Sequence, residues 1–178
     1  MPENERKDSA LPVILLKLVA FTCLAPGTVT VWLPLFILFP EIRHQPIEWN
    51  ASTAGAIALV AAGAGGYVWC ALDFAISGRG TPAPIDMPKY LVARGLYRYV
   101  RNPMYISVLT VLLGESALFR SARLLEYAGA VTIGFHVFVL VQEEPTLRRK
   151  MGKAYEEYCA RVPRWIPRMS ARRQDDAV

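Results

Sequence analysis

Several polar residues in the second half of this apolar chain have side chains suited to binding a charged small molecule. Asn102 precedes Pro103, a pair typical of a helix start, because asparagine can cap free backbone donors and proline is tolerated at the first helical position. The free amides and the positive dipole end of such a start can hold a carboxylate or another anion, and Arg101 adds charge beside it. A capped helix with a snorkelling arginine explains the same residues without a ligand.

Glu143 and Glu144 are adjacent acids at the end of a long apolar run, where a charge is costly unless it is solvated or paired. A ligand that carries an ammonium and a sulfonium group would supply the pairing charge. A solvated acid pair that balances Arg148, Arg149 and Lys150 explains the two acids equally well.

His136 lies seven residues before Glu143, about two turns of a regular helix. That spacing predicts that His136 and Glu143 share one face with Leu140 and Leu147, and we expect this face to look inward. Polar groups within apolar helices act in catalysis or only fix helix packing, and the sequence leaves both roles open for His136 and Glu115.

Apolar runs must carry these residues, because 53% of the 178 residues are hydrophobic and a membrane-spanning helix needs roughly 20. Four runs appear: Leu11–Phe39, Ala51 to about Ile76, Pro103–Phe119 and Leu124–Val141. The first has no small-residue cleavage site after it and is interpreted as a retained span. The last two are joined by a tight link and predict a hairpin. The expected fold is all-α, a polytopic membrane protein with about four transmembrane helices.

Two polar regions complete the predicted chain. The segment 78–103 is rich in proline and glycine and predicts a structured loop with one short helix around Tyr90 to Tyr99. The residues after the fourth run predict a C-terminal amphipathic helix on the cytoplasmic membrane surface, ended by Pro163. Its apolar positions recur at helical spacing and are Leu147, Met151, Tyr155, Tyr158 and Val162. We expect a single domain over 1–178, made of two spans (1–77), a cofactor-binding half (78–168) and a polar tail (169–178).

Basic residues predict the orientation, because cytoplasmic loops carry the excess of lysine and arginine. With both termini in the cytoplasm, 16 basic residues lie inside and three outside. We therefore expect a multi-pass membrane protein with its termini in the cytoplasm. The net charge of +5 belongs to the membrane side, since no nucleic-acid motif is present. The three cysteines have neither a disulfide framework nor a metal spacing, so no metal is expected.

The segment LVARGLYRYVRNPMY, the hairpin, and then EEPTLRRKMGKAYEEYCARVPRWIP together resemble the cofactor half of the isoprenylcysteine carboxyl methyltransferase family. This family is grouped with the phospholipid methyltransferases as integral membrane enzymes. The resemblance covers about Gly78–Pro167 and is strongest for bacterial members, which implies a protein of a bacterial inner membrane. It implies that S-adenosylmethionine binds at the cytoplasmic membrane edge and leaves as S-adenosylhomocysteine.

The resemblance also implies roles for single residues. The resemblance implies that Leu91 and Val92 line the adenosine site and that Tyr97 contacts the cofactor. It implies that Glu143 binds the amino group of the methyl donor. The residues implied to surround the donor are Asn102, Pro103, Met104 and Tyr105. Eukaryotic members have a histidine in place of Asn102, and an arginine for the substrate carboxylate in place of Val139. Arg164 is our candidate to replace that arginine in anion binding.

The implied reaction is direct methyl transfer to a lipophilic acceptor that enters from the bilayer, without a metal. A carboxylate acceptor needs no base, whereas an amine must be deprotonated, and His136 or Glu144 would then help. Three alternatives stay open: a phospholipid amine N-methyltransferase, a sterol-type membrane reductase that uses NADPH, and a helical scaffold without activity. The scaffold leaves Asn102 and Glu143 unexplained. The acceptor and the oligomeric state are not predicted.

Overall fold

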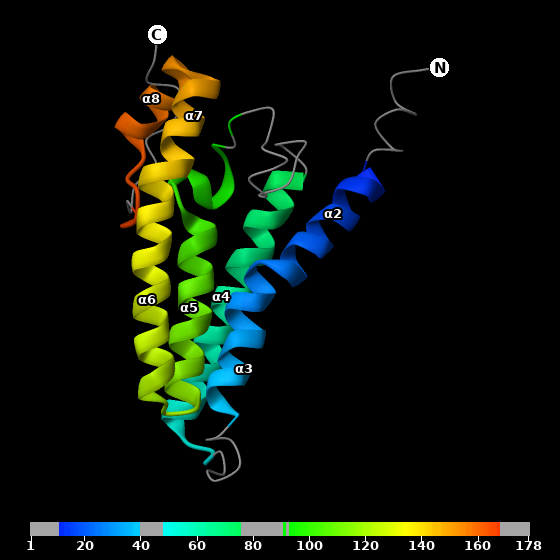
Figure 1. Ribbon diagram of the computed structural model, residues 1–178, viewed down its shortest axis with the longest axis vertical. Helices are drawn as coiled ribbons and strands as arrows, with labels where there is room; N and C mark the ends of the chain where they lie inside the picture. Colours follow the sequence, from blue (N-terminus) through cyan, green and yellow to red (C-terminus); the bar gives the residue numbers. More distant parts are fainter. Residues whose placement is uncertain (1–10, 40–47, 76–90, 92, 168–178) are drawn as a thin grey trace.

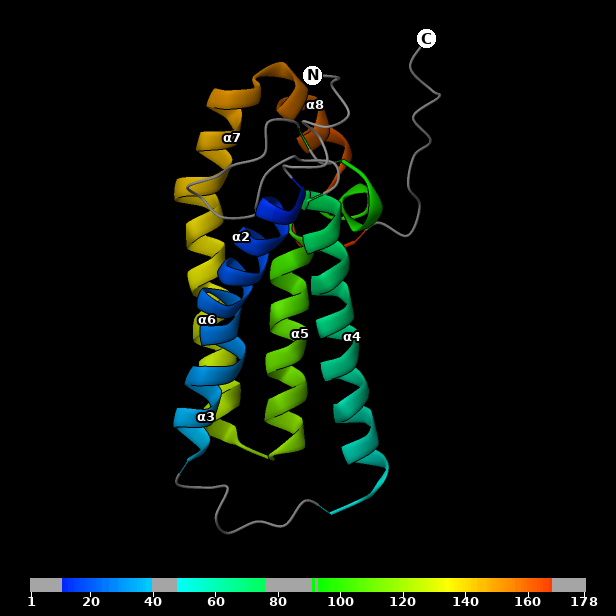
Figure 2. The ribbon, with the colours of Figure 1, turned by 90° about the vertical axis from the view of Figure 1, so that its right-hand side faces the viewer.

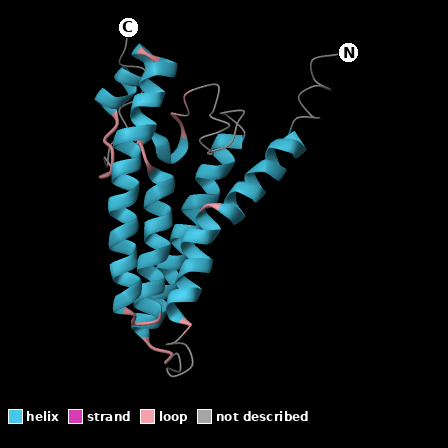
Figure 3. Ribbon diagram, in the orientation of Figure 1, coloured by secondary structure: helices cyan, strands magenta, loops and turns pink. Residues whose placement is uncertain are grey.

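The computed structural model describes residues 11–39, 48–75, 91 and 93–167, and the regular structure in these residues is helical (Figures 1 and 3). Within these described residues, three helices are long and apolar enough to cross a membrane, namely Leu16–Leu38, Ala51–Asp73 and Ala122–Met151, and Pro103–Leu118 is a shorter apolar helix. These ranges confirm the predicted all-α fold with about four spans. The chain is a multi-pass integral membrane protein.

The first span is bent in its middle. It consists of α2 (Leu11–Leu24), the π-helical turn η1 (Thr28–Trp32) and α3 (Leu33–Leu38). Proline lacks a backbone donor and commonly kinks a helix, and here Pro26 lies just before the π-helical turn. In Figure 1, α3 runs along the bundle while α2 leans away from it. A hydrogen bond of 2.9 Å between the Thr22 and Tyr67 hydroxyls links α2 to α4.

The second and third spans, α4 (Ala51–Asp73) and α5 (Pro103–Leu118), lie side by side in Figures 1 and 2. Asn50 caps α4, because its side chain accepts a hydrogen bond from the Thr53 amide at 3.0 Å. Glycine permits the close approach of the two helices. A Cβ atom at Gly63 would lie 2.7 Å from the Ser107 carbonyl oxygen, so no larger residue fits without a shift.

Gly63→Ala is therefore expected to destabilise the bundle by about 1–3 kcal/mol, the usual cost of overpacking a core. Gly65→Ala is the matched control, because a Cβ at Gly65 would meet nothing within 4 Å. The midpoint of thermal unfolding in detergent micelles checks this. Equal midpoints for the two variants would contradict the close α4–α5 contact.

The predicted hairpin is confirmed, because α5 is followed directly by α6 (Ala122–Phe138). Ser121 caps α6, and its side chain accepts a hydrogen bond from the Leu124 amide at 3.4 Å. The fourth span then continues beyond its apolar run through a π-helical turn, η4 (Val139–Glu143), into α7 (Glu144–Met151). The last helix is α8 (Lys153–Arg161).

The predicted amphipathic helix differs from the observed one in length and in surroundings. Gly152 has φ +53°, a conformation that favours glycine, and it separates α7 from α8. Only α8 is thus the C-terminal amphipathic helix, whereas Leu147 and Met151 belong to the continuation of the fourth span. The apolar face of α8 is covered by the protein itself, since Tyr155 and Tyr158 are buried in a cluster with both of those residues.

The loop before α5 contains a 3-10 helix, η3 (Gly95–Arg98), which is shorter than the predicted helix around Tyr90 to Tyr99. Residues 76–90 and 92 lie outside the described residues. Arg94 Nε forms an ion pair with Asp73 Oδ1 at 3.3 Å, at the end of α4. Gly95 has φ +55°, and a Cβ there would overlap the Asp73 carboxylate. Asp73 therefore fixes the position of η3 and of the buried Tyr97.

Candidate functional site

A cavity of about 440 Å³ lies at the end of the bundle where α5 begins. We refer to this as the α7–α8 end, because both of those helices lie there in Figures 1 and 2. The cavity lining includes apolar side chains, from Phe21, Ala25, Phe74, Phe135 and Phe138, and we call this part of the lining the apolar chamber. Its polar groups come from Arg101, Asn102, Tyr105, Gln142, Glu143 and Glu144, and we call them the polar side. The cavity is thus lined by both apolar and charged side chains.

Glu143 lines the polar side and has one neutral partner. The Tyr105 hydroxyl donates a hydrogen bond of 2.8 Å to Glu143 Oε2. Within the described residues, the groups that act on Glu143 are this hydroxyl, the Tyr97 hydroxyl and the Glu144 carboxylate, and none of them is a cation. The negative charge of Glu143 is therefore available to a cationic ligand in the cavity.

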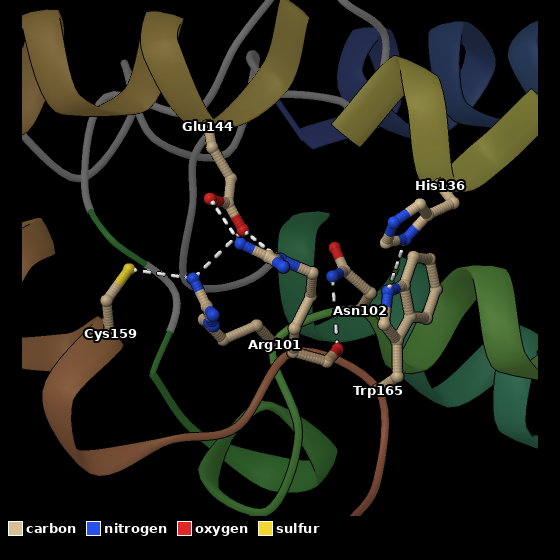
Figure 4. A network of polar contacts seen from close by, with 7 residues as sticks. Arg101, Asn102, His136, Glu144, Cys159 and Trp165 are labelled. Atoms are coloured by element: carbon tan, nitrogen blue, oxygen red, sulfur yellow. Dashed lines mark hydrogen bonds and ion pairs between the residues drawn. The ribbon is translucent and has the colours of Figure 1, made fainter. Parts of the chain in front are cut away.

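Glu144 has the opposite environment, because two arginines hold its carboxylate (Figure 4). Arg164 donates from Nε to Oε1 at 2.6 Å and from Nη2 to Oε2 at 3.0 Å, which is a bidentate pair. Arg101 donates from Nη1 to Oε1 at 3.0 Å and also contacts Cys159 Sγ at 2.9 Å. The hydrogen bond to Glu144 raises the pKa of Arg164, so the pair stays charged. Glu144 therefore connects α7 to α5 and to the C-terminal residues.

His136 does not share a face with Glu143, contrary to the sequence prediction. The π-helical turn Val139–Glu143 lies between them, and its wider turn takes up more residues than an α-helical one. Seven residues therefore no longer make two turns. His136 is exposed on α6 outside the cavity lining, and its Nδ1 accepts a hydrogen bond of 3.0 Å from Trp165 Nε1. Leu140, predicted on the same inward face, is 40% exposed.

Asn102 and Pro103 begin α5 as predicted, but Asn102 does not cap it with its side chain. The Asn102 amide instead donates from Nδ2 to the Arg164 carbonyl oxygen at 3.1 Å. The neighbouring Arg101 amide donates to the Pro163 carbonyl oxygen at 2.9 Å. The start of α5 is thus bound to the chain after α8, and the buried Asn102 also lines the cavity.

Tyr97 lines the cavity and is held by two contacts. Its ring packs edge-on against Phe74 with centroids 5.4 Å apart, and its carbonyl oxygen accepts a hydrogen bond of 2.8 Å from the Tyr158 hydroxyl. Burial raises the pKa of the Tyr97 hydroxyl well above its ordinary value, so this group stays protonated. Leu91 packs against the cluster of Tyr155 and Tyr158 beside it.

The structure brings most of the predicted site residues together. Seven line the cavity, namely Leu91, Tyr97, Asn102, Met104, Tyr105, Glu143 and Glu144. Pro103 is buried next to them, and Val92 lies outside the described residues. Arg164 does not line the cavity but binds Glu144, which does. His136 lies outside the cavity lining.

Sequence reasoning missed the phenylalanines of the apolar chamber. Phe21, Phe74, Phe135 and Phe138 occur within apolar runs, where a lining residue and a lipid-facing one have the same character. Phe36, for comparison, is 78% exposed in the same first span as Phe21. No residue pattern in the sequence distinguished the two.

One family model, described as phospholipid methyltransferase, matches residues 51–154 of the chain. The match begins with α4 and ends at the start of α8, so it contains η3, α5, α6 and α7 with Tyr97, Tyr105 and Glu143. The first span and the residues after 154, including Arg164, lie beyond it. No curated protein and no solved structure matches the chain.

Proposed function

This chain belongs to the phospholipid methyltransferase family, which makes it an S-adenosylmethionine-dependent integral membrane methyltransferase, and we propose that it methylates a lipophilic acceptor in the cavity at the α7–α8 end. In this proposal the α7–α8 end faces the cytoplasm, as the excess of basic residues predicts. The observation that carries the proposal is Glu143, an acid without a cationic partner among the described residues, beside an apolar chamber.

The residues of the polar side fit the methyl donor. The donor is an amino acid with an ammonium and a carboxylate group, joined to a sulfonium and an adenosine. Glu143 would bind the ammonium group, with Tyr105 keeping the carboxylate oriented. The first amides of α5 beside Asn102 would bind the carboxylate group. Leu91 and Tyr97 supply the flat apolar surface that an adenine ring needs.

When bound, S-adenosylmethionine supplies a methyl group that its positively charged sulfur already activates. The chain's own residues then have to align and shield the reactants. Phe135 and Phe138 face the cavity from the same helix as Glu143, so the apolar chamber is next to the donor site. This chamber would hold the acceptor's hydrocarbon part and exclude water from the reacting atoms.

The structure offers neither of the predicted bases in a suitable position. Glu144 is bound by Arg101 and Arg164, and His136 lies outside the cavity with its Nδ1 engaged by Trp165. A carboxylate acceptor needs no base, and this favours an O-methyltransferase similar to the isoprenylcysteine carboxyl methyltransferases. A phospholipid amine is the second candidate, because the matching family model is described as phospholipid methyltransferase. The family match supports both over the NADPH-dependent reductase and the inactive scaffold.

An acceptor assay distinguishes these two candidates. Protein reconstituted in vesicles would receive S-adenosylmethionine with a labelled methyl group, and either an S-prenylated cysteine derivative or phosphatidylethanolamine. We expect label in the prenylcysteine product, as an ester that mild base releases as methanol. Label that resists base and stays in the phospholipid would contradict O-methylation and support the amine acceptor. The S-prenyl compound with its carboxylate amidated is the matched control.

A further inference from the structure

The residues after α8 fold back along the helical hairpin as a strap, which we define as residues 162–167. In Figure 1 this strap descends from α8 beside α6. Two hydrogen bonds fix the first half of the strap to the start of α5. The backbone amide of Arg101 donates to the Pro163 carbonyl oxygen at 2.9 Å, and Asn102 Nδ2 donates to the Arg164 carbonyl oxygen at 3.1 Å. These bonds determine where the next residue, Trp165, can lie.

Trp165 contacts both helices of the hairpin, and Figure 4 shows its contact with His136 on α6. Its Nε1 donates a hydrogen bond of 3.0 Å to His136 Nδ1 on α6, and the two ring centroids are 6.0 Å apart. Its ring also contacts that of Tyr105 on α5, with centroids 6.5 Å apart. The hydrogen bond to His136 gives the indole N–H of the half-buried Trp165 an acceptor on α6.

Tyr105 is the link from Trp165 to the donor site. Its ring packs against Phe135 at a centroid distance of 4.6 Å as well as against Trp165, so both rings restrict its orientation. Its hydroxyl lies 2.8 Å from Glu143 Oε2. A hydrogen bond of this length needs the phenol ring in a narrow range of orientations.

We propose that Trp165 is a positioning residue for the methyl donor: it holds Tyr105 on Glu143 and thereby keeps that carboxylate directed at the donor's amino group. The proposal rests on the proposed function, in which Glu143 binds the donor. It gives the strap a role in binding although the family match ends at residue 154, before the strap begins. His136 in turn positions Trp165.

The test is a double-mutant cycle with S-adenosylhomocysteine as the calorimetric probe. Trp165→Ala is expected to weaken binding about fivefold, the worth of one aromatic contact. In a Tyr105→Phe background, which lacks the hydroxyl on Glu143, the same change should have almost no effect, because coupled residues are not additive. Trp165→Phe should restore most of the affinity. Ile166→Ala is the matched control in the strap, since Ile166 is 80% exposed.

An equal loss from Trp165→Ala in both backgrounds, or no loss in either, would overturn the inference. His136→Leu removes the acceptor for Trp165 and enters the same cycle if Trp165→Ala does not fold. Glu143→Gln is titrated beside these variants. If it loses binding while Trp165→Ala acts additively, the inference alone fails. If Glu143→Gln binds the probe as tightly as the wild type, the proposed donor site fails and the inference with it.

Discussion

Glu143→Gln is expected to weaken the binding of S-adenosylhomocysteine by about a hundredfold, because it removes the one charge proposed to pair with the ligand's ammonium group. Loss of one partner from a buried, hydrogen-bonded charge pair costs about 2–5 kcal/mol. Glutamine keeps the shape of the side chain and can still accept the hydrogen bond from Tyr105. Calorimetric titration of the purified protein in detergent measures the change.

The matched control for this prediction is Glu126→Gln. Glu126 lies on the same continuous helix and is exposed near its opposite end, so the substitution makes the same change in charge far from the cavity. NADPH serves as the competing ligand and is expected not to bind. Unchanged affinity in Glu143→Gln, or strong binding of NADPH with none of the homocysteine compound, would contradict the proposed donor site.

Glu144→Gln is expected to destabilise the protein by about 3 kcal/mol, because removing one member of a buried ion pair leaves the other charges without compensation. The side chains of Glu144 and Arg101 are 8% and 12% exposed, and Arg164 shares the same carboxylate. Without the negative charge, the two guanidinium groups face each other across a short distance. The midpoint of unfolding in detergent, by heat or denaturant, measures this effect.

Glu157→Gln is the control for Glu144. Its carboxylate is 71% exposed and lies 4.0 Å from Arg161, an exposed pair of the kind that contributes about 0–1 kcal/mol. In an Arg164→Gln background, Glu144→Gln should lower the stability by less than it does in the wild type, because one of the two uncompensated charges is gone. Equal stability of Glu144→Gln and Glu157→Gln would contradict a structural role for Glu144. Glu143 is thus expected to affect ligand binding, whereas its neighbour Glu144 is expected to affect stability.

The sequence was sufficient for the features that depend on composition and on short-range chemistry. Apolar runs predicted the spans, because each must bury its backbone polar groups in hydrocarbon through helical hydrogen bonds. Pro103 marked the start of α5, since proline fits the first helical position. The cost of a charge at the membrane edge indicated Glu143 and Glu144 as candidates for binding a cation, and both line the cavity.

Features that depend on long-range contacts were not predictable. Arg101 and Arg164 are 43 and 20 residues from Glu144, and nothing in the local pattern indicated that they meet on it. The π-helical turn Val139–Glu143 places His136 and Glu143 on different faces. The sequence prediction missed this because a periodicity argument assumes a regular α-helix throughout. Asn102 does not make the expected side-chain cap, and its Nδ2 instead donates to the Arg164 carbonyl oxygen, 62 residues away.

The most direct test of the donor site is a crystal structure of the protein with S-adenosylhomocysteine, grown in a lipid mesophase. We expect the ligand in the cavity at the α7–α8 end, with its amino group about 2.7–3.2 Å from a Glu143 carboxylate oxygen and its sulfur toward the phenylalanine-lined chamber. A ligand bound outside this cavity, or one whose amino group meets other residues while Glu143 contacts only Tyr105, would contradict the account.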